Sequence, residues 1–181
     1  MKHMKKILLL VLLGLIVQLP LGAFDKNSLY QMLIKFKNQK NETVSLGQFS
    51  GQKTVLALFF SSCQYACPLI LAEMKKIEKG LSAGQRQKIN WVMVSIDPET
   101  DTPEVLAAFA KQKQIEHYQL LTGREKDIRK LSALLETSYR KTGIKNFDHA
   151  ILITVLDEKG VMAHQQLGNG QDLSELFKKL K

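Results

Sequence analysis

Short apolar runs alternate with amphipathic stretches through most of this chain. Two runs, TVLALFF (54–60) and KINWVMVSI (88–96), are rich in β-branched and aromatic residues, as buried strands are. A third and shorter run is YQLL (118–121). After each run, apolar residues recur at intervals of three and four, the spacing of a helix that buries one face. The pattern therefore predicts strands that alternate with helices.

The helices that follow the three strands each have an apolar face. Those faces consist of Ile70, Met74, Ile77 and Leu81, then Val105, Leu106 and Phe109, then Ile128, Leu131 and Leu135. The second helix has a clear start, because the Thr102 hydroxyl can cap its first turn and Pro103 has no N–H to lose there. A last helix, capped by Asp172, would bury Leu173, Leu176, Phe177 and Leu180.

Two hairpins are expected outside this alternation. AILITVL (150–156) and VMAHQQL (161–167) flank the turn sequence DEKG, and NQKNETVSLGQFSG (38–51) indicates a short hairpin or leading strand. Alternating strands and helices favour a parallel core sheet, to which the late hairpin adds an antiparallel edge. The expected fold is thus α/β: a central mixed sheet with flanking helices and a C-terminal β-hairpin plus helix.

The N-terminus has the layout of a secretory signal peptide. Three lysines precede the apolar run Ile7–Val17, and QLPLGA then offers Ala23 for cleavage. The run is shorter than the ~20 residues of a membrane-spanning helix, and an uncleaved N-terminal anchor is the open alternative. We therefore expect residues 1–23 to be a leader and 24–181 one domain, in the periplasm or elsewhere outside the cytoplasm, or held at the inner membrane.

The net charge of the chain and its distribution indicate which classes of partner are compatible with it. The formal net charge is +9, and loss of the three lysines in residues 1–23 would leave +6. The remaining lysines and arginines are dispersed, without a basic stripe that alternates with aromatic residues, which argues against nucleic-acid binding. A weak attraction to anionic membranes or to an acidic partner protein is the more reasonable use of the excess.

The only two cysteines, Cys63 and Cys67, lie in FFSSCQYACPLI (59–70), between the first predicted strand and its helix. This position, at the end of a core strand, is typical of the thioredoxin-like fold. Exported cysteines usually form a structural disulfide, but such a bridge stabilises mainly by closing a long loop, and this one would enclose three residues. A reactive dithiol and a metal site are therefore the stronger alternatives.

The four-residue spacing favours a metal. Residues four apart on a helix have Cβ atoms about 5–6 Å apart, whereas a relaxed disulfide needs about 3.5–4.5 Å. Two sulfurs on one metal ion can lie up to ~4.6 Å apart, so chelation fits the spacing and a disulfide would be strained. At the start of a helix, the macrodipole is also expected to lower the thiol pKa values.

Histidine is the natural third ligand. His3 is in the leader, and His117 lies between polar residues, which indicates a surface position. His164 lies in the predicted edge strand VMAHQQL, where a histidine is more often exposed than a ligand. His149 immediately precedes the strand predicted at 150–156, and loops of such sheets converge at one edge. Spacing alone leaves two readings of His149 open, a metal ligand or an ordinary loop histidine.

Four segments together resemble one family. VLALFFSSCQYACP, VMVSIDPETDTPEVLAAFA, LLTGREKDIRKL and DHAILITVLDEKG are similar, in this order, to motifs of the Sco/SenC family. The resemblance implies a thioredoxin-like fold outside the cytoplasm and one copper ion, as Cu(I) and also Cu(II), held by Cys63, Cys67 and His149. It also suggests Asp97 and Asp101 as secondary residues near the metal or the partner, although a turn and helix-capping role explains them equally well.

The same resemblance implies a function. Family members assemble the dinuclear copper centre of cytochrome c oxidase by delivering copper, by reducing the recipient's cysteines, or both. We expect a monomeric copper chaperone whose partner is the copper-containing oxidase subunit or another exported protein. The alternative is a periplasmic thiol-disulfide reductase that uses Cys63 and Cys67 as its catalytic redox pair without metal. A peroxidase is disfavoured, because Phe60 and Leu56 stand where such sites have Thr or Ser and Pro.

Overall fold

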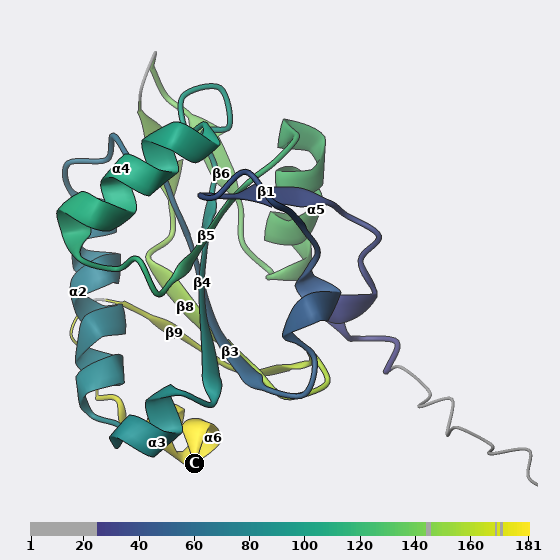
Figure 1. The fold of residues 1–181 in the computed structure, drawn as a ribbon, viewed down its shortest axis with the longest axis vertical. Helices are drawn as coiled ribbons and strands as arrows, with labels where there is room; N and C mark the ends of the chain where they lie inside the picture. Colours follow the sequence, from purple (N-terminus) through teal and green to yellow (C-terminus); the bar gives the residue numbers. More distant parts are fainter. Residues whose placement is uncertain (1–24, 144–145, 169, 171) are drawn as a thin grey trace, which may run out of the picture.

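The computed structural model describes residues 25–143, 146–168, 170 and 172–181, so the predicted leader lies outside the described residues. A seven-stranded sheet with the order β2-β1-β5-β4-β3-β8-β9 forms the centre (Figure 1). Its strands are β1 (Phe36–Asn38), β2 (Thr43–Val44), β3 (Lys53–Phe59), β4 (Ile89–Ser95), β5 (Gln119–Thr122), β8 (Leu152–Leu156) and β9 (Met162–Leu167). A separate two-stranded sheet pairs β6 (Tyr139–Lys141) with β7 (Phe147–His149).

Helices cover both faces of the main sheet. They are η1 (Leu29–Gln31), η2 (Leu46–Phe49), α2 (Ala66–Lys79), α3 (Ala83–Arg86), α4 (Pro103–Lys113), α5 (Glu125–Leu134) and α6 (Ser174–Leu180). The crossovers β3–α2–β4 and β4–α4–β5 step in one direction across the sheet, so right-handed connections place α2 and α4 on the same face. The chain then turns back toward β8, and α5 lies on the opposite face (Figure 1). Among the described residues, no helix has the length and apolar character needed to span a bilayer.

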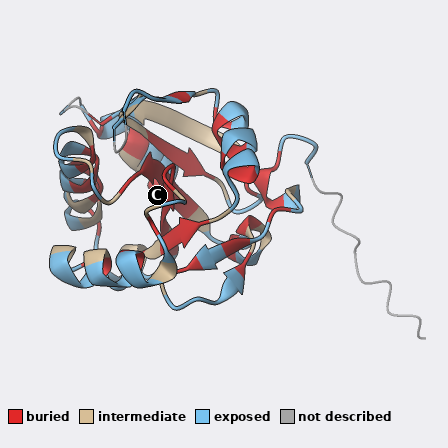
Figure 2. Cartoon of the chain, turned by 90° about the horizontal axis from the view of Figure 1, so that it is seen from above, coloured by how far each residue is buried: buried red, intermediate tan, exposed pale blue. Residues whose placement is uncertain are grey.

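The core lies between these layers, where Figure 2 shows the central strands in red. Six of the seven β3 residues are buried, and Leu106, Ile128 and Leu131 from the helices are fully buried against the sheet. The prediction for Val105 was wrong, since its side chain is 36% exposed. The buried stripe of α4 consists of Leu106 and Ala110, four residues apart, and Val105 lies beside that stripe.

The strand register brings three loops to one edge. In the parallel pair β3–β4, Phe59 lies opposite Ser95, so both strands end at the same level. Strand β8 is antiparallel to β3, with Ile153 opposite Ala57, and therefore starts at this level. The segments 60–65, 96–102 and 149–151 meet here, as expected for a doubly wound sheet.

Most predicted elements are confirmed, and several details differ. The N-terminal hairpin is β1–β2, with Phe36 opposite Val44, and the C-terminal hairpin is β8–β9. The β6–β7 hairpin was not predicted from the sequence. Helix α6 has Leu173 at its N-cap, one residue later than expected, although the Asp172 carboxylate accepts a hydrogen bond from the Ser174 backbone N–H.

Candidate metal centre

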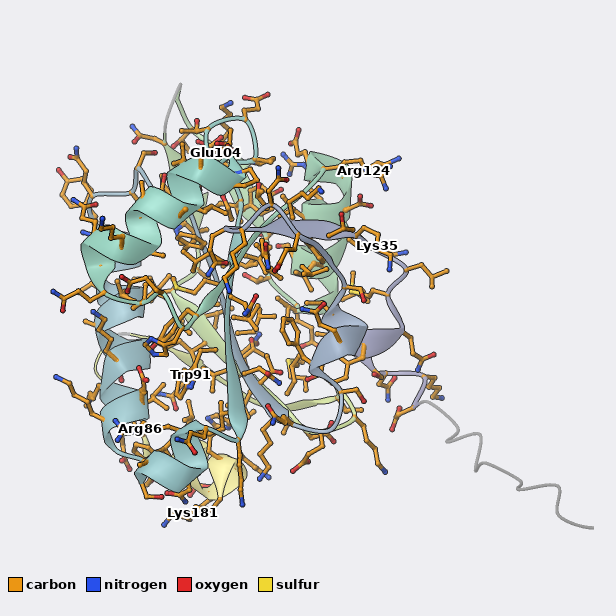
Figure 3. All side chains as sticks on the ribbon, viewed as in Figure 1. Lys35, Arg86, Trp91, Glu104, Arg124 and Lys181 are labelled. Carbon is orange, nitrogen blue, oxygen red and sulfur yellow. The ribbon has the colours of Figure 1, made fainter. Side chains whose placement is uncertain are left out.

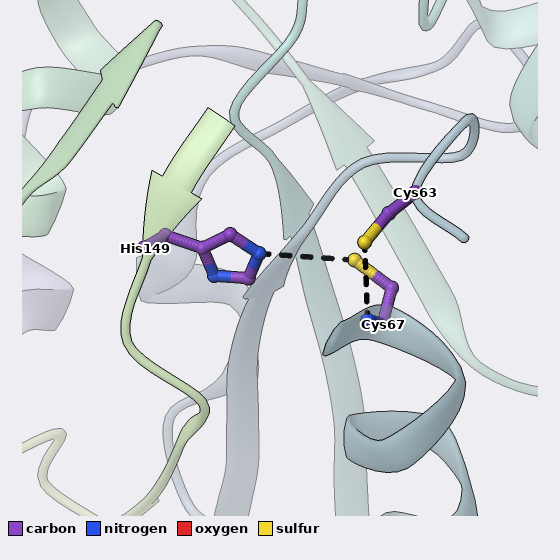
Figure 4. A group of neighbouring side chains, drawn as sticks. All are labelled: Cys63, Cys67 and His149. Atoms are coloured by element: carbon purple, nitrogen blue, oxygen red, sulfur yellow. Dashed lines mark hydrogen bonds between the residues drawn. The ribbon is translucent and has the colours of Figure 1, made fainter. Parts of the chain in front are cut away.

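Three side chains that are distant in the sequence meet at this edge of the sheet. One potential ligand atom from each of Cys63, Cys67 and His149 lies within 4.8 Å of the other two. His149 Nε2 is 3.9 Å from Cys67 Sγ, and both point into the space beside Cys63 (Figure 4). The structure thus brings together the three residues that the sequence analysis selected.

The two cysteines come from different local structures. Cys67 lies in the first turn of α2, whereas Cys63 lies in the preceding loop, where its N–H donates to the Phe60 carbonyl at 3.2 Å. The assumption that both lie on one helical turn was therefore wrong. The turn instead folds back, so that the Cys67 N–H donates to Cys63 Sγ at 3.3 Å. Both cysteines are free thiols.

Cys67 is the more enclosed thiol. Its side chain is 3% exposed, and its sulfur accepts a hydrogen bond from the Phe60 N–H at 3.4 Å. Burial raises the pKa of Cys67 well above its ordinary value, against the expected effect of the helix dipole. Desolvation outweighs the macrodipole because this sulfur is packed beneath the loop. A cation at the site would reverse that balance by stabilising the thiolate.

His149 presents a suitable donor atom. It is the last residue of β7, and its Nδ1 lies 3.1 Å from the Ala150 carbonyl oxygen. A carbonyl only accepts, so Nδ1 carries the hydrogen, which leaves the Nε2 lone pair toward Cys67. Burial lowers the pKa of His149 and favours the neutral ring that metals bind. The ring edge packs on Phe60, with centroids 5.8 Å apart.

The donor set fits a soft cation of low coordination number. Three atoms about 2.3 Å from a central ion in one plane lie about 4 Å apart, close to the separations observed here. Thiolates select Cu(I), and imidazole suits either oxidation state of copper. The residues are therefore compatible with a copper ion in both chemistry and spacing.

Asp97 and Asp101 are buried behind the cysteine loop and lie outside the three-residue group. The Asp101 carboxylate accepts hydrogen bonds from the Ser61 N–H at 2.9 Å, the Ser61 hydroxyl and the Ser95 hydroxyl. The Asp97 carbonyl accepts from the Asp101 N–H, which closes the turn before α4. Asp97 Oδ2 has no hydrogen-bond partner among the described residues. These contacts match the turn role, and a secondary role toward a metal or partner stays a prediction.

An open groove of about 730 Å³ borders Cys63. Phe60, Tyr65 and Phe147 supply its aromatic walls. The Tyr65 side chain is 84% exposed, so the wall beside the cysteine loop faces solvent. Phe60 and Phe147 pack on each other with centroids 5.1 Å apart, a contact that the sequence analysis missed. The signal available was the alternation of Phe147 and His149 within one short strand.

The other described histidines take no part in the site. His117 is 2.8 Å from a Glu78 carboxylate oxygen and half-exposed, and His164 contacts Gln166 in β9. Both lie outside the three-residue group, as the sequence analysis expected.

This chain is similar in sequence and in structure to several proteins whose names contain Sco. The SCO2-like protein of Rickettsia prowazekii is 27% identical over 149 residues, 78% of this chain and 72% of that relative. The structure of Bradyrhizobium japonicum ScoI with copper bound matches with a TM-score of 0.69 at 22% identity, over 81% of this chain and 94% of ScoI. The structure of BsSco, a Sco protein with a disulfide switch, has a TM-score of 0.71 at 22% identity, over 81% and 88% of the two chains.

These structural matches confirm the predicted thioredoxin-like α/β fold. A sequence model described as SCO1/SenC matches residues 25–181. The match includes both cysteines, the 97–101 turn and His149. Because it extends over the whole chain from residue 25 onward, this protein belongs to the SCO1/SenC family.

Proposed function

We propose that this protein binds one copper ion through Cys63, Cys67 and His149 and delivers it to the copper-containing subunit of cytochrome c oxidase. The carrying observation is the convergence of two sulfurs and one imidazole nitrogen within 4.8 Å of one another. Copper is the cargo of this reaction. The ScoI relative was solved with copper bound, and BsSco belongs to a family of cytochrome c oxidase assembly proteins.

Delivery requires that the recipient's ligands reach the ion. The groove beside Cys63 provides an approach, while Cys67 and His149 lie deeper against Phe60. A recipient thiolate that enters from the groove would replace Cys63 first. Stepwise ligand exchange avoids release of a free ion, because at least two donors hold the copper at each stage.

The test is anaerobic Cu(I) competition against a chelator of known affinity. His149→Ala should lower the affinity at least about 10- to 100-fold, the loss found for outer-shell residues, and the matched His164→Ala variant should bind like the wild type. Equal affinities of the wild type and His149→Ala would contradict the three-ligand site. A variant that binds Cu(I) with unchanged affinity but no longer transfers it would separate delivery from binding.

A thiol-disulfide reductase is the second candidate, since both thiols are free and their sulfurs lie within 4.8 Å. The Cys63 thiolate would attack a recipient disulfide, and Cys67 would then displace the second recipient thiol. The recipient gains two electrons, and a Cys63–Cys67 disulfide forms. A reduction potential near the thioredoxin range, about −270 mV, would favour this activity, and a much higher value would oppose it.

Both proposed activities act on a recipient outside the cytoplasm. We infer that residues 1–23 direct export, as a cleaved signal or as an anchor at the inner membrane, and that 24–181 is the functional domain. Cell fractionation with mass spectrometry of the N-terminus tests both statements. A cytoplasmic protein that begins at Met1 would contradict the inference.

A further inference from the structure

A strap of chain, residues 26–35, runs alongside α5 on the face of the sheet opposite α2 and α4. Met32 and Leu134, the last residue of α5, line one groove of about 630 Å³. At the other end, the Lys35 carbonyl lies beside Gly123, just before α5. The strap therefore follows the helix from its end to its start. Figure 3 labels Lys35 and Arg124 on this side of the molecule.

The surface that the strap and helix share is basic. We call it the α5 face and define it by Lys26, Leu33, Lys35, Lys126, Lys130 and Leu134. On α5, Lys126, Lys130 and Leu134 are four residues apart and lie on one exposed stripe. Within the described part of the chain, none of the four lysines lies within 4 Å of an acidic group, whereas Arg129 pairs with Glu125 on the same helix. The nearby acidic residues Asp25 and Glu136 offset only part of the positive charge of the four lysines.

The same surface carries apolar side chains in contact with water. Leu33 is 98% exposed, and Leu134 is 47% exposed. Elsewhere on the described chain, Tyr65 and Leu69 flank the metal centre, where a recipient explains them. Nothing in the proposed copper chemistry uses Leu33. Basic and apolar side chains on one surface are the combination that binds the interface of an anionic bilayer.

The position of the N-terminus identifies the occupant. Residue 25, where the described chain begins, enters the strap directly, and seven residues separate it from the apolar run Ile7–Val17. Seven extended residues reach at most about 25 Å, so a retained run would hold the strap near the lipid surface. We propose that the α5 face rests on an anionic membrane surface, with Leu33 and Leu134 inserted among the headgroups.

This orientation keeps the metal centre accessible. The α5 face lies across the sheet from α2, whose first turn carries Cys67 (Figure 1). Leu167, at the metal end of β9, is as exposed as Leu134 but pairs with Leu152 at the edge that carries the site. The groove beside Cys63 therefore stays open to a recipient while the domain lies on the membrane.

The experiment places a reporter on each side of the full-length protein. Leu33→Trp and the matched Leu167→Trp variants are reconstituted in lipid nanodiscs that contain brominated acyl chains, which quench nearby tryptophan. Trp91, 4% exposed, supplies the same background in both. We expect strong quenching at position 33 in discs with anionic lipid, weaker quenching in zwitterionic discs, and little at position 167 in either.

Charge variants test the electrostatic part. In the Leu33→Trp background, Lys126→Glu/Lys130→Glu should lower the ratio of docked to undocked protein by about fivefold or more for each lysine, whereas Lys88→Glu/Lys111→Glu, an equal charge change elsewhere, should not. Equal quenching at positions 33 and 167, or quenching at 33 that ignores lipid charge, would overturn the proposal. Absence of quenching at 33 in both discs would also overturn it.

Discussion

The two cysteines have different surroundings although only three residues separate them. Cys63 is half-buried and borders the open groove, whereas Cys67 is buried and hydrogen-bonded to the Phe60 N–H. The two thiols therefore differ in their access to solvent. In the proposed transfer, Cys63 would be the sulfur that a recipient meets, and Cys67 would hold the inner side of the site.

Alkylation of the metal-free protein should follow this order. Iodoacetamide reacts with an accessible thiolate, and the raised pKa and burial of Cys67 reduce both thiolate and access. We expect Cys63 to be modified first, as measured by digestion and mass spectrometry of quenched samples. In urea the two rates should become similar. Faster modification of Cys67 in the folded protein would contradict the assignment.

Asp101 illustrates a buried residue that supports the site without belonging to it. Its carboxylate is fully buried and accepts from Ser61 and Ser95, which link the cysteine loop to β4. Burial raises the pKa of Asp101, and its hydrogen bonds offset part of that cost. The loop that carries Cys63 therefore depends on a carboxylate from the next loop.

Removal of that carboxylate should destabilise the protein. Asp101→Ala leaves the Ser61 and Ser95 donors without an acceptor, and each unsatisfied buried group costs about 1–3 kcal/mol. We expect the free energy of unfolding in urea to fall by at least about 2 kcal/mol, with a small change for the exposed Glu116→Ala control. An unchanged unfolding midpoint for Asp101→Ala would show that the loop does not rely on these bonds.

At the scale of elements, the β6–β7 hairpin determines where His149 lies. An isolated two-stranded hairpin is marginal in water, so contacts with the rest of the fold must hold it. Phe147 packs on Phe60, and Lys141 Nζ lies 2.8 Å from a Glu99 carboxylate oxygen. Those contacts connect the hairpin to the loops that follow β3 and β4.

The Lys141–Glu99 pair should make the hairpin sensitive to pH. The hydrogen bond from Lys141 holds the pKa of Glu99 below its ordinary 4.5. The restraint is therefore complete above pH 4.5 and is lost as the pH falls through the lowered value. Glu99→Gln should speed amide hydrogen exchange in β6 and β7 a few-fold at neutral pH. Once the pH lies below that lowered pKa, Glu99 is protonated, and the variant and the wild type should exchange at the same rate.

The matched control is Glu175→Gln, which removes a similar exposed pair within α6. It should leave exchange in the hairpin unchanged. Equal exchange in the wild type and Glu99→Gln at neutral pH would show that aromatic packing alone holds the hairpin.

The success of the sequence prediction varied with the source of each element's stability. The apolar pattern of the sequence largely predicted strands β3 and β4 and the buried faces of α4 and α5, because burial of that pattern defines these elements. The β6–β7 hairpin was not, since each strand has three residues and its stability comes from Phe60 and Glu99, which are distant in sequence.

The candidate site shows the same division. Convergence of loops at a sheet edge, together with the family resemblance, was enough to select Cys63, Cys67 and His149. The departure of Cys63 from the helix and the burial of Cys67 depend on packing around Phe60. Local spacing carries no information on that packing.

For the whole molecule, the proposed site joins local and distant parts of the chain. The cysteines are four residues apart and remain near each other in an unfolded chain, whereas His149 is 82 residues beyond Cys67 and comes close only in the folded state. Copper bound by all three should therefore stabilise the native fold. Copper bound by the cysteines alone should have similar affinities for the folded and the unfolded chain and should therefore stabilise the fold little.

This difference predicts how Cu(I) changes thermal stability. A ligand that binds only the folded state adds about 2.7 kcal/mol at 100 times its Kd, and any binding to the unfolded chain subtracts from this gain. We expect buffered Cu(I) under anaerobic conditions to raise the Tm of the wild type clearly and that of His149→Ala much less, with His117→Ala matching the wild type. The Tm values are measured by calorimetry at equal occupancy of the copper site, so that the variants are compared under equivalent conditions. Equal increases in Tm would mean that the imidazole contributes no binding energy specific to the fold, and the copper would then be held by the local dithiol alone.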